Sequence, residues 1–142
     1  MPPAIVFAIL LGLVVLATAL GLLWRATTGR AVTGDLTVVS LPEIPPARAT
    51  LLQLSTAVCA PCVPTRSLLA RIAAERSGVQ HVDIDLTDRA DLAARFAVLQ
   101  TPTTLVLDAR GAIRARIGGA PRPAEVSEAL DRILLASKAD AR

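Results

Sequence analysis

The hydrophobic residues of this 142-residue chain follow one pattern near the N-terminus and another beyond it. From Ala4 to Trp24 the sequence is almost entirely apolar, and the first charged residue is Arg25. As a helix, this run spans roughly 30 Å, the thickness of the hydrocarbon core of a bilayer. Beyond residue 48, apolar residues recur at the spacings of amphipathic helices and buried strands. The pattern therefore predicts an N-terminal apolar helix followed by a globular body.

Three interpretations of the apolar run compete, and a membrane anchor is favoured. Trp24 and Arg25 suit the membrane interface at the end of a spanning helix. A cleaved signal peptide needs a basic start, which residues 1–3 lack, although Ala-Thr-Ala at 17–19 resembles a cleavage site. A buried core helix would carry polar residues on one face, and none occur here. We therefore expect residues 1–25 to form a single-pass transmembrane anchor.

The side of the membrane on which the body lies is less strongly indicated. Arg25 and Arg30 follow the apolar run, and no Lys or Arg precedes it. The positive-inside rule therefore favours a cytoplasmic body. The extracytoplasmic side stays open as an alternative, because dithiol chemistry operates on both sides of a membrane.

The residues between the anchor and the body, 26–48, are expected to form a linker. Residues 26–34 are small and polar, which is typical of a tether. Residues 36–39 are candidates for a short edge strand. Pro42 and the pair Pro45–Pro46 then interrupt regular structure before the body begins at Ala49.

The remaining region, 49–142, has the pattern of one α/β domain. The predicted strands are 49–55, 80–86, 103–107 and 112–117, and the predicted helices are 60–76, 88–96 and 123–137. The first two strands should be parallel and joined by a right-handed crossover. The last two should form an antiparallel hairpin turning at Gly111. We therefore expect a mixed central sheet with helices on both faces.

Composition excludes several classes of protein. With 53% hydrophobic and 19% charged residues and a net charge of +3, the chain is not of the disordered class. Two cysteines are too few for a disulfide-rich secreted scaffold. Only Phe96 is aromatic after Trp24, and the arginines are scattered, which argues against nucleic-acid binding.

The candidate chemistry lies in Cys59 and Cys62, where the strand 49–55 leads into a helix. The unpaired N–H groups at a helix start carry partial positive charge, which stabilises a thiolate. Cys59 is then the exposed nucleophile that attacks a disulfide, and Cys62, one helical turn later, resolves the mixed disulfide. Pro61 stiffens the loop between the two sulfur atoms.

Other interpretations of these residues lead to different chemistry. A zinc site needs about four ligands, and Cys59, Cys62 and His81 are the only soft candidates, so no metal is expected. The cysteine pair could instead be inert and buried, or form a structural disulfide. His81 is interpreted as a structural or exposed residue. The aspartates at 83, 85, 88 and 91 are interpreted as strand-end and helix-capping residues.

A second candidate feature is the Thr101–Pro102 peptide bond, just before the strand 103–107. A cis peptide bond would explain a proline that enters a buried strand, although cis is the minority form of X–Pro bonds. The alternative is a trans proline that merely begins the strand.

The region from about Thr50 to Leu135 resembles the thioredoxins. The resemblance is carried by ATLLQLS running into CAPC, by HVDIDL, by the TPT segment with its proline, by the Gly118–Gly119 bend and by the terminal helix. It implies a thioredoxin-like fold, in which Pro102 is cis and lies against the cysteine pair. It also implies that the backbone of Thr101 pairs with a bound peptide substrate, and that no cofactor is needed.

Several positions depart from the usual thioredoxin pattern. Val58 stands where a tryptophan usually precedes the first cysteine, and Ala60 stands where a glycine follows it. Gln53 replaces a buried acid that assists proton transfer from the resolving thiol, and Gln cannot take up a proton. Val63 replaces a lysine after the second cysteine. These changes bear on the redox potential rather than on the fold.

The sequence therefore predicts a membrane-tethered thiol–disulfide oxidoreductase that reduces protein disulfides and is re-reduced by a separate electron donor. One alternative is a disulfide oxidase or isomerase outside the membrane, because the direction depends on the potential of the pair. Another is a binding module without catalysis that keeps the fold and uses its peptide groove.

Overall fold

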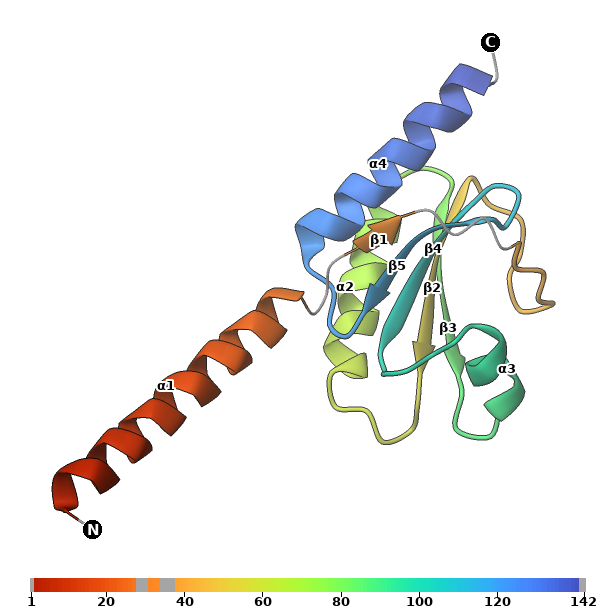
Figure 1. The fold of residues 1–142 in the computed structure, drawn as a ribbon. Helices are drawn as coiled ribbons and strands as arrows, with labels where there is room; N and C mark the ends of the chain where they lie inside the picture. The colour runs from red at the N-terminus through yellow and green to blue at the C-terminus, as the bar shows by residue number, and fades with distance from the viewer. Residues whose placement is uncertain (1, 28–30, 34–37, 141–142) are drawn as a thin grey trace.

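A five-stranded mixed sheet lies at the centre of the fold, with its strands in the order β1-β5-β4-β2-β3 (Figure 1). The computed structural model describes residues 2–27, 31–33 and 38–140. The strands are β1 Ala31–Thr33, β2 Ala49–Ser55, β3 Val79–Asp85, β4 Thr103–Asp108 and β5 Ile113–Gly118. The helices are α1 Pro3–Thr27, α2 Cys62–Ala74, α3 Ala90–Arg95 and α4 Pro123–Asp140.

Strand β2 is the central strand, and all seven of its residues are buried. It runs parallel to β3 through the crossover helix α2, and antiparallel to β4. Strands β4 and β5 form the antiparallel hairpin. The predicted mixed sheet is therefore confirmed. The predicted helix 60–76 begins later, at Cys62, because Pro61 occupies the N-cap position.

Helices cover both faces of the sheet, as predicted (Figure 1). On one face, side chains of α2 and α4 such as Leu69 and Leu130 pack against residues of β2, β4 and β5. On the other face, Leu92 of α3 and Phe96 pack against Leu52 and Leu105. Because helices cover both faces of the sheet, side chains on both sides of β2 are buried, which explains why its sequence is mainly apolar.

An edge strand precedes the one predicted at 36–39. It is β1 at Ala31–Thr33, which pairs antiparallel with β5, within the stretch expected to be a tether. Of the predicted strand 36–39, residues 36 and 37 lie outside the described residues. Val38 forms an isolated bridge with Ala112, and Val39 is buried. The pattern of residues 31–33 does not predict β1, because its pairing partner, β5, lies about eighty residues further along the chain.

Helix α1 projects away from the sheet (Figure 1). Its segment Pro3–Leu23 has a mean hydropathy of 2.8, and none of it is buried. Among the described residues it is the one helix long and apolar enough to cross a membrane, a test that a signal sequence near the N-terminus would also pass.

Candidate active site

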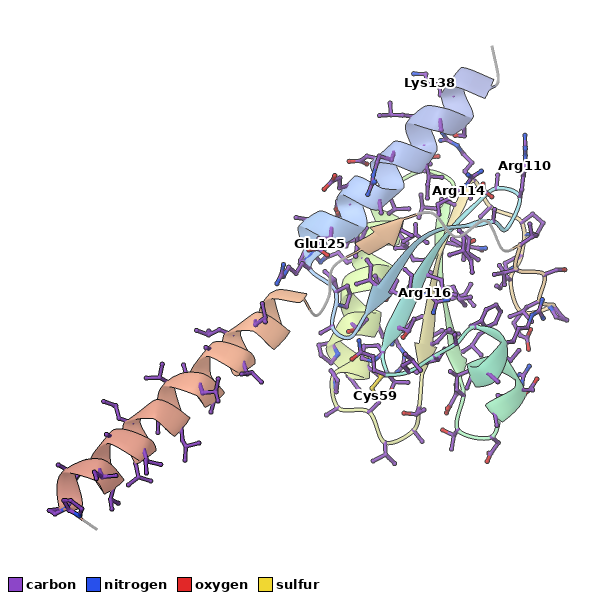
Figure 2. All side chains as sticks on the ribbon, in the orientation of Figure 1. Cys59, Arg110, Arg114, Arg116, Glu125 and Lys138 are labelled. Atoms are coloured by element: carbon purple, nitrogen blue, oxygen red, sulfur yellow. A yellow bond between two sulfur atoms is a disulfide. The ribbon has the colours of Figure 1, made fainter. Side chains whose placement is uncertain are left out.

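The two cysteines form a disulfide where β2 leads into α2 (Figure 2). Their Cα atoms are 5.3 Å apart. Cys62 is the first residue of α2 and is buried, whereas Cys59 is partly exposed. The N–H of Cys62 donates to the carbonyl oxygen of Cys59 at 3.1 Å. The sulfur that a substrate can reach is therefore that of Cys59.

The start of α2 presents backbone donors rather than negative charge. Among the described residues no side chain caps the helix at Pro61, and the first turn contains no acidic residue. The carbonyl of Pro61 accepts from both the N–H and the hydroxyl of Thr65, at 3.3 Å and 2.8 Å. The partial positive charge of the helix start is therefore not neutralised, which favours a thiolate at the reduced pair.

Gln53 connects this helix start to the centre of the sheet. Its side chain is fully buried, and Nε2 donates to the carbonyl oxygen of Cys62 at 3.0 Å. Its Oε1 lies 3.3 Å from Nε2 of His81 on β3. Since the amide nitrogen is the donor to Cys62, Oε1 is left as an acceptor, and the imidazole Nε2 carries the hydrogen. Gln53 thus holds Cys62 through its backbone.

His81 is half-buried, which the sequence interpretation as a structural or exposed residue did not connect with the site. Burial lowers the pKa of His81, Asp83 opposes this shift, and Arg66 adds to it. The imidazole is therefore neutral at neutral pH. The signal that finds this contact is the alternation of β2 and β3, because parallel neighbours point side chains of the same parity to one face.

An ion pair fastens α2 to the sheet beside the cysteines. Arg66 on α2 donates to Oδ2 of Asp83 through Nε at 2.6 Å and also through Nη2. The hydroxyl of Ser55 donates to the other carboxylate oxygen of Asp83 at 2.7 Å. Asp83, which the sequence suggested was a strand-end residue, therefore ties the C-terminal end of β2 to α2.

The Thr101–Pro102 peptide bond is cis, and Pro102 is buried. The carbonyl oxygen of Pro102 accepts from the N–H of Gly119 at 2.8 Å. The hydroxyl of Thr101 lies 3.3 Å from that of Thr56, in the loop that leads from β2 to Cys59. These contacts join the segment before β4 to the loop before the cysteines. The expected contact of Pro102 with the disulfide and the pairing of Thr101 with substrate stay predictions.

Apolar side chains are exposed in the loops near the disulfide. Val58 is 98% exposed and Leu99 is 96% exposed. Ala60, Pro61 and Val63 are also exposed. Where the usual thioredoxin pattern has a large tryptophan, this chain has a small side chain that lies almost fully in solvent.

Other features of the structure do not add to this site. No group of three or more potential metal-ligating side chains is found in the part of the chain that the structure describes. A cavity of about 500 Å³ lies between the β4–β5 hairpin and the end of α4, lined among others by Arg114 and Ile133. Arg110 and Arg114, which border it, lie far from Cys59 at the opposite end of the sheet (Figure 2).

Comparisons with known proteins show that solved thioredoxins share the fold of this chain. No protein-family model and no curated protein matches the chain. Solved structures do match. Mitochondrial thioredoxin 3 from Saccharomyces cerevisiae is 20% identical, with a TM-score of 0.53 over 61% of this chain and 79% of that one. A thioredoxin from Nicotiana alata is 23% identical, with a TM-score of 0.53 over 61% and 73%.

Thioredoxin f2 from Chlamydomonas reinhardtii is also similar, at 19% identity and a TM-score of 0.54 over 63% of this chain and 82% of that one. At these identities the likeness establishes the fold. The chain therefore has the thioredoxin fold, with a mixed sheet covered by helices on both faces. Within that fold it carries a Cys-X-X-Cys disulfide at the start of α2.

Proposed function

We propose that this protein is a thiol–disulfide oxidoreductase that reduces disulfides in protein substrates. The observation that carries the proposal is the position of the Cys59–Cys62 disulfide at an uncapped helix start, with Cys59 partly exposed and Cys62 buried. This asymmetry assigns attack to Cys59 and resolution to Cys62. The thioredoxin fold of the chain and the solved thioredoxins that it resembles support the same chemistry.

The proposed reaction moves two electrons from the dithiol to the substrate. The Cys59 thiolate attacks one sulfur of the substrate disulfide, that bond breaks, and the leaving substrate sulfur takes up a proton. The Cys62 thiol then loses its proton and attacks the Cys59 sulfur. The Cys59–Cys62 disulfide forms and the second substrate thiol is released. A dithiol donor must reduce the pair again before the next turnover.

The exposed side chains near the disulfide define the proposed substrate surface. Val58 and Leu99 offer apolar contacts near Cys59, and Pro61 limits the freedom of the loop between the cysteines. The backbone of Thr101, before the cis bond to Pro102, is the proposed partner of an extended substrate segment. Such a surface favours a disulfide in an extended segment with apolar neighbours over one within a folded core.

We further propose that α1 anchors the protein in a membrane. Its uncharged segment Pro3–Leu23 is long enough to span a bilayer, and its side chains are exposed to their surroundings. The proposed organisation is an anchor at 1–25, a connecting segment at 26–48 that includes β1, and the thioredoxin-like domain at 49–142. Arg25 and Arg30 support a cytoplasmic position for the domain.

Substitution of each cysteine tests the proposed function. In dithiothreitol-coupled reduction of insulin, C59S should lower the rate to the background of dithiothreitol alone, because the nucleophile is lost. C62S should accumulate mixed disulfides with its substrates, because the resolving thiol is lost, and C59S is the matched control that should trap none. Wild-type turnover by C59S would overturn the proposal.

A redox titration of the same preparations against glutathione separates reductase from oxidase. A reductase should have a potential near that of thioredoxins, about −270 mV, whereas a potential near −120 mV favours disulfide formation.

A further inference from the structure

One row of backbone partners crosses the sheet from its edge to the cysteine pair. Ala31 of β1 pairs with Ile117, Ile117 pairs with Thr104, and Thr104 pairs with Gln53. The side chain of Gln53 in turn bonds to the carbonyl of Cys62. Three strand spacings of about 4.8 Å separate Ala31 from Gln53, so the backbone of β1 lies about 15 Å from the backbone of Gln53.

The connection between α1 and this row is short. Helix α1 ends at Thr27 and β1 begins at Ala31, so residues 28–30 span at most about 14 Å, whatever their conformation. The part of α1 beyond the apolar segment Pro3–Leu23 adds about 6 Å. Ala31 therefore lies within about 20 Å of the end of the apolar segment, the sum of these two limits.

Strand β1 is held in the domain and provides no slack. All three of its residues pair with β5, from Ala31 with Ile117 to Thr33 with Ala115. Further along, Val38 bridges to Ala112 and the N–H of Val39 donates to Gly111 at 2.7 Å. Lengthening the connection would require these hydrogen bonds to break.

These limits keep the backbone of Gln53 within about 35 Å of the end of the apolar segment, and the disulfide lies about one side-chain length further away. The headgroup region occupies roughly 5–8 Å of this distance. We propose that the substrates of this protein are disulfides in the membrane-proximal segments of other membrane-anchored proteins. The inference rests on the proposed function, which supplies both the anchor and the chemistry. A disulfide held well above this height on a rigid support is out of reach, whereas one near the lipid surface is presented at high effective concentration.

Two synthetic substrates in proteoliposomes test the reach of the full-length protein. Each is a single-span peptide with a disulfide-closed loop, either directly outside the bilayer or above a 40-residue helical stalk of about 60 Å. With dithiothreitol as donor, the wild type should reduce the loop at the surface at least about tenfold faster than the loop on the stalk. Equal rates for the two loops would overturn the inference.

A linker variant shows whether the short connection causes this preference. An insertion of 40 Gly and Ser residues between Thr28 and Gly29 adds about 35 Å of typical reach. It should bring the two rates to within about twofold of each other. The control carries the same 40 residues after Arg142 and should keep the wild-type preference. A preference that survives the insertion at Thr28 would contradict the inference.

Two accompanying measurements separate failure of the inference from failure of the proposed function. Insulin reduction in detergent should be the same for the wild type and both insertion variants, because the insertions leave Cys59 and Cys62 unchanged. Loss of insulin reduction by the wild type, or failure of the chain to stay with the liposomes, would overturn the proposed chemistry or the anchor. Intact chemistry and anchoring without a height preference would overturn this inference alone.

Discussion

Gln53 and Thr104 are partners across β2 and β4, and the two buried side chains differ in how their polar atoms are satisfied. The amide of Gln53 bonds at both ends, to the Cys62 carbonyl and to His81. The hydroxyl of Thr104 has no hydrogen-bond partner among the described residues. An unsatisfied buried hydroxyl costs free energy, so Thr104 does not contribute a polar interaction to the core.

Replacing Thr104 by valine should therefore leave the free energy of unfolding unchanged or raise it by up to about 1 kcal/mol, because valine has a similar shape without the hydroxyl. The neighbouring T103V variant is the matched control. The hydroxyl of Thr103 donates to the carbonyl of Gln100 at 2.7 Å, and its loss should lower the free energy of unfolding by about 1 kcal/mol. Urea denaturation of both variants measures the difference, and equal destabilisation by the two changes would contradict this account.

His81 should make the stability of the fold depend on pH. Burial is the main cause that lowers its pKa in the folded state below 6.5, the ordinary value of a histidine. The unfolded chain therefore binds this proton more readily, and the free energy of unfolding should fall as the pH drops below about 6.5 towards the lowered folded pKa. Above pH 6.5 the contribution of His81 is fully present.

The variant H81Q can still donate a hydrogen bond to Gln53 but cannot titrate. Between pH 7.5 and pH 5.5, the free energy of unfolding of the wild type should therefore fall relative to that of H81Q. Two charged groups act on the side chain at position 81, namely Asp83 and Arg66, and both are the same in the two proteins. Parallel stability curves for the two proteins would exclude His81 as the titrating group.

Most elements of the sheet could be predicted from local patterns. Strand β2 has the predicted bounds, because a run of apolar residues between a proline-rich segment and a helix start has one reasonable assignment. Strand β1 could not be placed, because its three residues gain their structure from pairing with a distant partner, β5. Edge pairing of this kind leaves no periodic signal in so short a segment.

The candidate site divides in the same way. Cys59, Cys62 and Pro102 are visible in the sequence because their chemistry depends on residue type and spacing. The bond between Gln53 and His81 depends on the register of β2 with β3, which the sequence does not specify residue by residue. The tie between Arg66 and Asp83 depends in addition on how α2 lies over the sheet.

The turn between β4 and β5 joins these two strands and also contacts the backbone of Val39, in the segment before β2. Gly111 has a φ of +77°, and a Cβ atom there would lie 2.5 Å from the backbone oxygen of Val39. Neither the left-handed conformation nor the backbone contact can be relieved by a side-chain movement. G111A should therefore lower the free energy of unfolding by about 1–2 kcal/mol or more.

G118A is the matched control for this change. Gly118 is not in the left-handed region, and its added Cβ would meet the end of the flexible Gln100 side chain, which can move. Chemical denaturation should therefore show a smaller loss for G118A than for G111A. The opposite order would mean that the contact with Val39 is not what constrains this turn.

The chain as a whole combines a well-packed domain with an apolar helix, α1, whose described side chains are exposed. The two apolar clusters on either side of the sheet use side chains of β2, β4, α2 and α4, and no described side chain of α1 belongs to either. Burial of apolar surface is the main favourable contribution to folding, and the exposed side chains of Pro3–Leu23 bury none in the domain. The exposed apolar surface of α1 is therefore left to be covered by its surroundings. Its length and composition match the hydrocarbon core of a bilayer.

For an anchored chain, the row of paired residues from Ala31 to Gln53 limits the distance between the reactive sulfur and the membrane surface. Proteins confined in this way find each other by lateral diffusion, as a search in two dimensions. The frequency of their encounters follows the number of copies per unit of membrane area. Crowding more of both proteins into the same patch of lipid would speed the exchange, while a larger or smaller volume of surrounding fluid would leave it unchanged.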